Sequence, residues 1–146
     1  GLSGCGYAIG NLYAVKNVEV PVFENNSVWR TNELDLTNAV VRELQAQGIR
    51  VGGREAEYEL LGTISGFEQP TVVEGLDDEV LVGSLSVQLD ILLRNRKTGK
   101  TTIKESRVEK ASIMSARGEN VDTARFEVFD KLAKWVATRM EKPWNE

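Results

Sequence analysis

Residues 84–93 read SLSVQLDILL, and this stretch decides how the rest of the chain can fold. It is the centre of a longer segment, residues 80–93, in which apolar and polar side chains alternate. Alternation with a period of two is typical of a β-strand that buries one face and exposes the other. The face predicted to be buried holds Leu85, Val87, Leu89, Ile91 and Leu93. The opposite face holds Ser84, Ser86, Gln88 and Asp90.

The residues after this strand predict that the chain doubles back on itself. Residues 95–100, NRKTGK, have the composition of a hairpin connection, in which Gly99 can adopt a positive φ angle. Residues 101–113 then continue as a more polar strand. Ile103 and Val108 have opposite parity, so a regular strand would not place both on its buried face. We therefore expect either a β-bulge in this strand or a position at the edge of the sheet.

Two earlier segments also alternate. Residues 17–23, NVEVPVF, predict a strand with Val18, Val20 and Val22 on one face and Glu19, Pro21 and Phe23 on the other. The proline lacks a backbone donor, so we expect either that this strand lies at an edge or that the Pro21 nitrogen points away from the ladder. Residues 57–67, EYELLGTISGF, predict a second strand whose inner face includes Gly62 and Gly66. Two glycines on one inner face indicate that a helix packs very close to it.

Two helices are predicted from periodicity and capping residues. The first covers residues 33–47, with Thr31 or Asn32 at its start and Gly48 just after its end. The second begins after Asn120 or Asp122 and stops at Pro143. Its apolar stripe consists of Val121, Ala124, Val128, Leu132, Val136 and Met140.

These elements predict an α+β fold. We expect a four-stranded mixed β-sheet with two α-helices packed on one face, in the order strand, helix, strand, strand, strand, helix. The first strand–helix–strand unit should be a right-handed parallel crossover. Residues 1–16 are predicted to be an N-terminal tether, residues 17–142 a single domain and residues 143–146 a short C-terminal tail.

Composition excludes several classes of function. The chain has 146 residues, no histidine and a net charge of −4. Without histidine, Ser-His-Asp and Cys-His catalysis are impossible and the commonest metal ligand is missing. The acidic balance argues against a nucleic-acid-binding protein. The consecutive acids Asp77, Asp78 and Glu79 favour a solvated loop over a carboxylate-based hydrolase site. We therefore expect a protein that is not an enzyme and that holds no metal or cofactor.

The single cysteine, Cys5, follows Leu2-Ser3-Gly4. This stretch resembles a bacterial lipobox, in which a peptidase cuts before the cysteine and acyl chains are attached to it. Each buried methylene contributes about 0.8 kcal/mol, so two or more chains make a stable membrane anchor. A free thiol and an intermolecular disulfide are the alternatives. With Gly6 after the cysteine, the resemblance to a lipobox implies sorting to the outer membrane.

Several segments, taken in order, resemble the LptE family of lipopolysaccharide-assembly lipoproteins. They are Cys5-Gly6-Tyr7, residues 18–25 (VEVPVFEN), residues 41–44 (VREL), residues 61–66 (LGTISG) and the long strand that runs into Thr98-Gly99. The resemblance implies an outer-membrane lipoprotein that faces the periplasm and is held to the membrane by its lipid anchor only. It also implies two partners, an LptD-like β-barrel that the protein plugs and lipopolysaccharide.

The resemblance further implies which residues contact lipopolysaccharide. Basic residues are expected in the loop between the second and third strands and just before the last helix, at one end of the sheet. Arg117 matches the second position, with Arg30 at the same end, whereas the first position is acidic, around Glu74. There a divalent cation could bridge the acids to phosphate.

Independently of the resemblance, strand parity, that is, the alternating direction of successive strands, sorts the loops between the two ends of the sheet. It predicts that the opposite end gathers Arg50, Arg54, Arg94, Arg96, Lys97 and Lys100. These cations predict either a soluble rim or a surface that attracts anionic headgroups. In the second interpretation, Arg96, Lys97 and Lys100 form a candidate membrane-proximal basic patch.

A second resemblance leaves an alternative open. Residues 20–26, VPVFENN, also resemble lipoprotein subunits of secretion channels and periplasmic domains of the Tol system. That reading would make the protein a self-assembling pore component or an adaptor. The outer face of residues 80–113 is too polar to meet lipid, which argues against a membrane-inserted hairpin.

Overall fold

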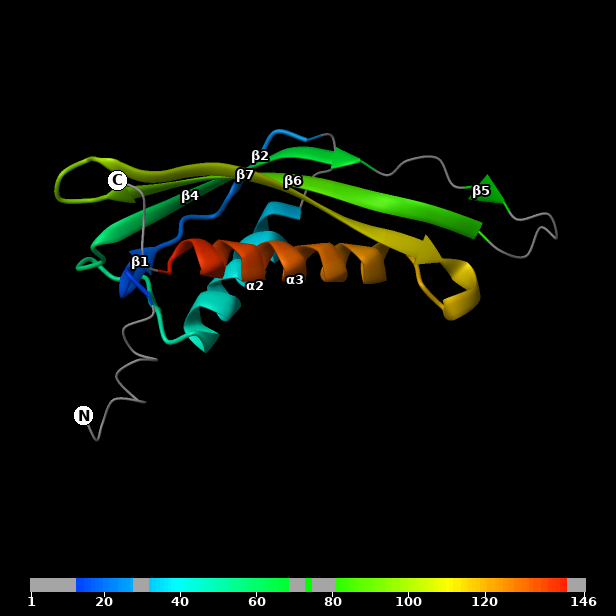
Figure 1. The fold of residues 1–146 in the computed structure, drawn as a ribbon, viewed down its shortest axis with the longest axis horizontal. Coiled ribbons are helices and arrows are strands. Elements are labelled where there is room, and N and C mark those ends of the chain that lie inside the picture. The colour runs from blue at the N-terminus through cyan, green and yellow to red at the C-terminus, as the bar shows by residue number, and fades with distance from the viewer. Residues whose placement is uncertain (1–12, 28–31, 69–72, 75–80, 142–146) are drawn as a thin grey trace.

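A long antiparallel hairpin forms the centre of the sheet (Figure 1). In the computed structural model, which describes residues 13–27, 32–68, 73–74 and 81–141, it consists of β6 (Leu81–Asn95) and β7 (Thr101–Met114). The alternation predicted for residues 84–93 is confirmed, because all five apolar residues assigned to the buried face are at most 2% exposed. Gly99 in the connection has a φ of 74°.

The sheet contains seven strands, whereas four were predicted. The additional ones are short: β2 (Glu24–Asn25), β3 (Arg50–Val51) and β5 (Val73–Glu74). β1 (Asn17–Glu19) pairs in parallel with β3 and with β4 (Tyr58–Glu68), and β4 and β7 flank β6 on either side in antiparallel pairing. The predicted parallel relation between the first strand and the strand after the helix is thus confirmed. The α+β class and the mixed sheet are confirmed as well.

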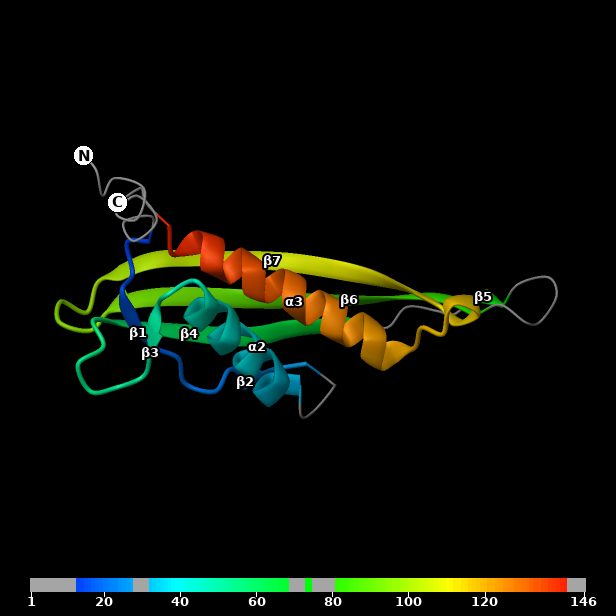
Figure 2. The ribbon, with the colours of Figure 1, turned by 90° about the horizontal axis from the view of Figure 1, so that it is seen from below.

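Two helices cover one face of the sheet and leave the other open (Figures 1 and 2). α2 (Asn32–Ala46) buries Leu36, Val40 and Leu44, and Gly48 follows it with a φ of 85°. α3 (Val121–Arg139) begins after the cap residue Asn120, whose side chain accepts a hydrogen bond from the Thr123 amide. The buried side of α3 contains Ala124, Val128, Phe129, Leu132, Ala133, Val136 and Ala137. No helix among the described residues is both long and apolar enough to cross a membrane.

The strand predicted over residues 17–23 was wrong beyond Glu19, and β1 lies between β3 and β4 rather than at an edge. β1 ends at Glu19, and β2 starts only at Glu24. Val22, predicted to lie on the buried face, is 57% exposed, while Phe23 is only 2% exposed. The proline supplies no amide hydrogen to a sheet ladder, so pairing stops there and the chain re-enters alongside β4 with the opposite parity.

The structure explains Gly62 on the inner face of β4 differently from the prediction, which expected a closely packed helix. The three atoms nearest to a Cβ atom at Gly62 would all belong to the Phe23 ring and not to a helix, and the nearest, Phe23 Cδ1, would be 2.6 Å away. Gly66 does not share this role, because a shift in register between Ile64 and Gly66 brings Phe67 to the buried face in its place. The buried Thr37 hydroxyl on α2 accepts a hydrogen bond of 2.9 Å from the Phe23 amide, which holds the ring in position.

β7 lies at an edge of the sheet, which was one of the two predicted arrangements. Its register with β6 shifts only at Leu93/Arg94, close to the hairpin, so no bulge separates Ile103 from Val108. Ile103 is buried and Val108 is 46% exposed, as opposite parity requires. The boundaries proposed for the tether, the domain and the tail remain a prediction.

Candidate functional site

The predicted site residues lie at opposite ends of the β6–β7 hairpin. Arg117 follows β7 at one end, and the basic hairpin connection is at the other. The paired strands extend from Val82↔Met114 to Arg94↔Thr101. Twelve steps of about 3.3 Å separate these two pairs by about 40 Å. One small ligand therefore cannot contact both sets of cations. Cys5 and Arg30 lie outside the described residues.

The end that carries Arg117 projects beyond the helices (Figure 1). A short 3-10 turn, Ser115–Arg117, joins β7 to α3, and Gly118 follows it with a φ of 75°. The Glu119 carboxylate accepts a hydrogen bond of 2.7 Å from the Met114 amide and so closes the turn. Arg117 is exposed, and its guanidinium has no hydrogen bond or ion pair to any residue in the described part of the chain. Within the described part of the chain, the guanidinium is therefore available to an anion.

The start of α3 offers less to an anion than its position suggests. Four amides at a helix start lack helical partners. The Asn120 amide donates to the Thr123 hydroxyl at 2.8 Å, and the Thr123 amide donates to the Asn120 side chain at 2.9 Å. This leaves the amides of Val121 and Asp122 without a partner among the described residues. The carboxylates of Glu119 and Asp122 also lie close by, so an anion here would depend mainly on Arg117.

The opposite end gathers the hairpin connection and the loop after β3, as parity predicted. Arg96 forms an ion pair with Glu19 at 3.2 Å and reaches the carbonyl oxygens of Gly53 and Ala56 at 3.4 Å. Arg94 pairs with Glu59. Two of the predicted cations therefore have structural partners.

Lys97 and Lys100 differ from these arginines. Both are exposed, and neither has an ion pair within the described part of the chain. The Asn95 side chain fixes the turn between them by accepting hydrogen bonds from the Lys97 and Thr98 amides at 2.9 and 3.1 Å. Of the predicted patch, these two lysines are the ones available for anionic headgroups.

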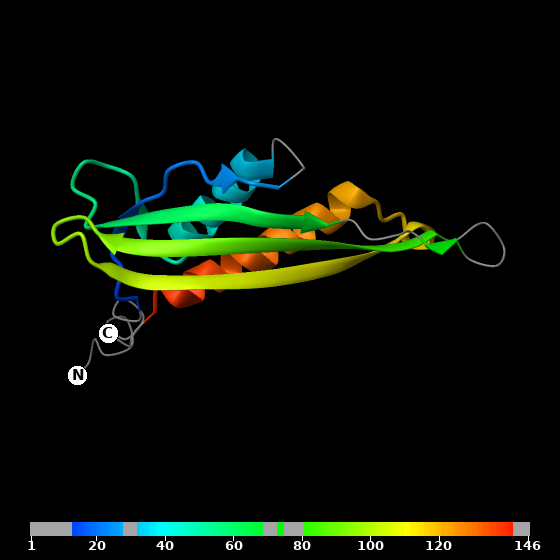
Figure 3. The same cartoon turned by 90° about the horizontal axis from the view of Figure 1, so that it is seen from above.

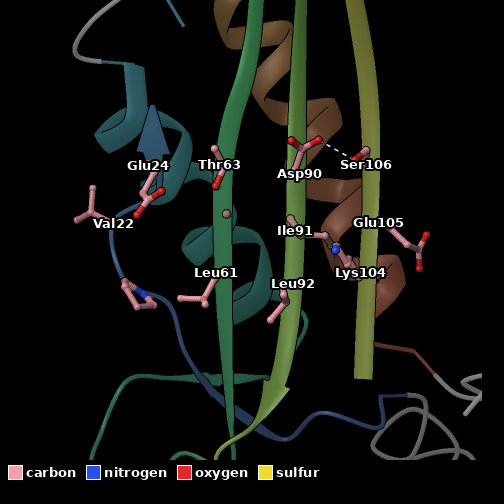
Figure 4. A pocket seen from close by; sticks show the side chains of 12 residues that line it. Val22, Glu24, Leu61, Thr63, Asp90, Ile91, Leu92, Lys104, Glu105 and Ser106 are labelled. Atoms are coloured by element: carbon pink, nitrogen blue, oxygen red, sulfur yellow. Dashed lines mark hydrogen bonds between the residues drawn. The ribbon is translucent and has the colours of Figure 1, made fainter. Parts of the chain in front are cut away.

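Sequence reasoning missed a groove of about 660 Å³ on the open face of the sheet (Figure 4). One wall is the segment that leads from β1 into β2, with Pro21, Val22 and Glu24. The floor is formed by β4, β6 and β7. Leu61 and Leu92 make one part of the floor apolar. A signal was present in the sequence, since both leucines fall on faces that are otherwise polar.

The polar part of the groove is organised around Asp90. Its carboxylate accepts hydrogen bonds from the Ser106 hydroxyl at 2.6 Å and from the Gln88 side chain at 3.2 Å. Partial burial by itself would raise the pKa of Asp90, but hydrogen bonds from Ser106, Gln88 and Ser65 together lower it below the usual value of 3.8. The carboxylate is therefore ionised at neutral pH and contributes a fixed negative charge to the groove.

This pKa predicts a specific dependence of stability on pH. Because the pKa in the folded state is below the unfolded value, the ionised carboxylate stabilises the fold above pH 3.8, and this contribution is lost as the pH falls through the lower, folded-state value. We expect the free energy of unfolding to fall less between pH 5 and pH 2 in Asp90→Asn than in the wild type, measured by urea titration. Ser106→Ala should move the pKa of Asp90 upward in carboxyl NMR, and an unchanged pKa would contradict the assignment.

The described residues contain no group of three or more acidic, histidine or cysteine side chains placed to hold a metal ion. The groove and the two ends instead offer apolar surface, one fixed carboxylate and exposed cations. Such features can bind a ligand or a protein.

Comparison with known proteins adds a family to this geometry. The family model described as lipopolysaccharide-assembly, LptE, matches residues 15–140. No curated protein matches the chain. The family model thus covers both helices and the whole of the β6–β7 hairpin.

Solved structures of several bacterial proteins share the fold. The protein CT253 from Chlamydia trachomatis is 11% identical, with a TM-score of 0.59 over 85% of this chain and 96% of that one. The PelC dodecamer from Paraburkholderia phytofirmans is 15% identical, with a TM-score of 0.56 over 88% of this chain and 90% of that one. Lipoprotein GNA1162 from Neisseria meningitidis is 10% identical, with a TM-score of 0.52 over 83% and 97% of the two chains. At these identities the likeness shows the fold alone.

Proposed function

The chain belongs to the LptE family of lipopolysaccharide-assembly proteins, and from this premise we propose that it plugs a partner β-barrel of the LptD type in the outer membrane. Family membership implies a lipoprotein of the cell envelope that acts in lipopolysaccharide assembly and is not an enzyme. In the finer proposal, acyl chains on Cys5 anchor the protein to the outer membrane, and the domain faces the periplasm. Lipopolysaccharide is the cargo that the complex delivers to the cell surface.

The observation that carries this proposal is the family match over residues 15–140, which spans the whole described fold. The surface is compatible with a large protein partner. Val22, Leu34 and Phe126 are each more than half exposed, and they lie on three different segments of the chain. A barrel wall that surrounded the domain would cover these three side chains.

Affinity purification from outer membranes tests the partnership directly. The full-length protein, expressed with its own signal in a Gram-negative host and extracted with detergent, is expected to bring down one β-barrel larger than itself. The mass of the N-terminal peptide from the same sample should include acyl chains on Cys5. Recovery of a homo-oligomeric ring without a barrel would overturn the proposal in favour of a secretion-channel subunit. An unmodified Cys5 would overturn the lipid anchor alone.

Arg117 is the proposed contact for lipopolysaccharide phosphate at the projecting end. A guanidinium can hold phosphate with two parallel hydrogen bonds, which a lysine ammonium cannot reproduce. Arg30 belongs to the same proposal because the sequence assigns it to this end. The membrane-proximal role proposed for Lys97 and Lys100 concerns the opposite end, so the two roles can be tested separately.

Reversal of the charge at Arg117 should weaken lipopolysaccharide binding. We expect Arg117→Glu to lose about 1.5–3 kcal/mol of binding free energy, as for a lost hydrogen bond to a charged group, and Arg117→Lys to lose less. Thermal stability should barely change, because the side chain has no partner among the described residues. The matched control is Lys97→Glu, an exposed lysine at the other end. If only the control weakens binding in a titration with purified lipopolysaccharide, the cargo contacts the hairpin end instead.

A further inference from the structure

In the middle of β7, no other described strand pairs with the edge that faces away from β6, although the C-terminal half of α3 lies beside this edge on one face of the sheet (Figure 3). Five consecutive residues, Lys104–Val108, are exposed, which is unusual for a strand that lies against a helix. Strand edges present backbone N–H and C=O groups that can pair with another strand, and proteins usually protect them. In β7, some of the backbone groups that face away from β6 are bonded by other parts of the chain.

The direction of the backbone groups follows from two contacts. The Lys110 carbonyl oxygen accepts a hydrogen bond of 3.1 Å from the Lys131 ammonium of α3. The Met114 amide donates to the Glu119 carboxylate at 2.7 Å, and the Met114 carbonyl oxygen accepts from the Glu119 amide at 3.3 Å. Even-numbered residues of β7 therefore turn these groups away from β6.

The same parity applies to the exposed segment. No register shift occurs in β7 between Ile103 and Met114, so the outward groups alternate without interruption. Lys104, Ser106 and Val108 therefore direct their N–H and C=O groups toward the free edge. No described residue bonds these groups on that side. Lys131 bonds the outward carbonyl oxygen of Lys110, and Glu119 bonds the outward groups of Met114. At residues 104–108 the outward backbone groups have no such partner within the described chain.

The charges along the open segment select a partner. We propose that Lys104–Val108 pairs antiparallel with the same segment of a second copy of this chain, about a two-fold axis through Ser106. Ser106 then faces Ser106 of the second copy, and Lys104 faces Val108. Arg107 of each copy faces Glu105 of the other, as a pair without backbone hydrogen bonds, in which side chains come closest.

Other registers of self-pairing are less favourable. An axis through Arg107 would place Lys104 opposite Lys110 and Glu105 opposite Glu109, and like charges directly opposite are destabilising. An axis through Lys104 would place two lysines side by side. An axis through Val108 would extend the pairing past Lys110, whose carbonyl oxygen is already bonded to Lys131. The axis through Ser106 has no like-charged pair and uses the open residues.

Contacts within each chain support the charges that would meet. The Arg107 guanidinium pairs with Glu109 at 2.8 Å, and Glu105 pairs with Arg139 at 3.4 Å. In the dimer these pairs would join into a row of alternating charge on each side of the axis. Each row would consist of Arg139 and Glu105 of one copy followed by Arg107 and Glu109 of the other. A contact of five residues a side is smaller than a standard interface of about 800 Å² per partner, so we expect a weak dimer. A barrel wall that surrounded the domain would leave no room for a second copy at this edge, so the pairing concerns the protein outside the barrel and is tested without the barrel.

Cysteine cross-linking tests the register. Single variants Lys104→Cys, Ser106→Cys and Val108→Cys are made in the full chain carrying Cys5→Ala. Residues that face each other in a hydrogen-bonded pair lie about 5.5 Å apart at Cα, which suits a disulfide. Under mild oxidation the Ser106→Cys protein should cross-link to itself at least tenfold faster than the other two. Equal rates, or faster linkage at position 104 or 108, would overturn the proposal.

Charge reversal tests whether Arg107 and Glu105 meet across the two-fold axis. Arg107→Glu and Glu105→Arg each place like charges opposite each other across the axis. Each variant alone should therefore stay monomeric in sedimentation experiments up to about 1 mM. At that concentration a dimer with a dissociation constant of about 1 mM would be half formed. An equimolar mixture of the two variants restores both opposite-charge pairs and should form a heterodimer. Circular dichroism confirms that each variant is folded. Dimers of either single variant, or no heterodimer in the mixture, would overturn the pairing.

Discussion

Phe23→Ala is expected to destabilise the protein by about 3–5 kcal/mol, the usual range for removal of a buried aromatic ring. The ring is 2% exposed and fills the space above Gly62, which has no side chain of its own to replace it. Its loss also frees the segment that forms one wall of the groove on the open face. Urea unfolding monitored by circular dichroism measures the change.

The neighbouring residue supplies the control for this variant. Val22 is 57% exposed, so Val22→Ala should cost less than about 0.5 kcal/mol, as for an ordinary surface substitution. A similar loss in both variants would mean that the segment contributes through its backbone alone. The structural account of Phe23 would then be wrong.

Gly62→Ala is expected to destabilise the protein by about 1–3 kcal/mol, the usual cost of overpacking a core. The added Cβ atom would lie 2.6 Å from the Phe23 Cδ1 atom, so the ring must move. Part of the cost should disappear when the ring is absent. In the double variant with Phe23→Ala, the Gly62→Ala substitution should therefore cost at least about 1 kcal/mol less than it does alone.

Gly66→Ala is the matched control on the same strand. A Cβ atom there would meet only Gln88 Cβ at 3.5 Å, an ordinary contact. This variant should be neutral or slightly stabilising, because alanine reduces the freedom of the unfolded chain. Additive effects of Phe23→Ala and Gly62→Ala, or a large loss in Gly66→Ala, would contradict the packing described for Phe23.

The candidate site was only partly predictable. Strand parity correctly placed Arg117 and the hairpin cations at opposite ends, since the direction of each strand follows from the connections. It could not show that Arg96 is paired with Glu19, because residues 77 positions apart meet only when β1 and the hairpin are packed together. The groove was missed for the same reason. Its wall comes from a segment whose path depends on where pairing stops at Pro21.

What the sequence determined by itself was the set of elements with strong periodicity. The strand at residues 84–93, the two helices, the Asn120 cap and the Gly99 turn depend on local patterns of burial and capping, which neighbouring residues carry in full. Only the tertiary structure decided which face of the Pro21–Phe23 segment is buried and why β4 needs Gly62. Those outcomes depend on a single ring filling a space between α2 and the sheet, and no pattern within either segment records the size of that space.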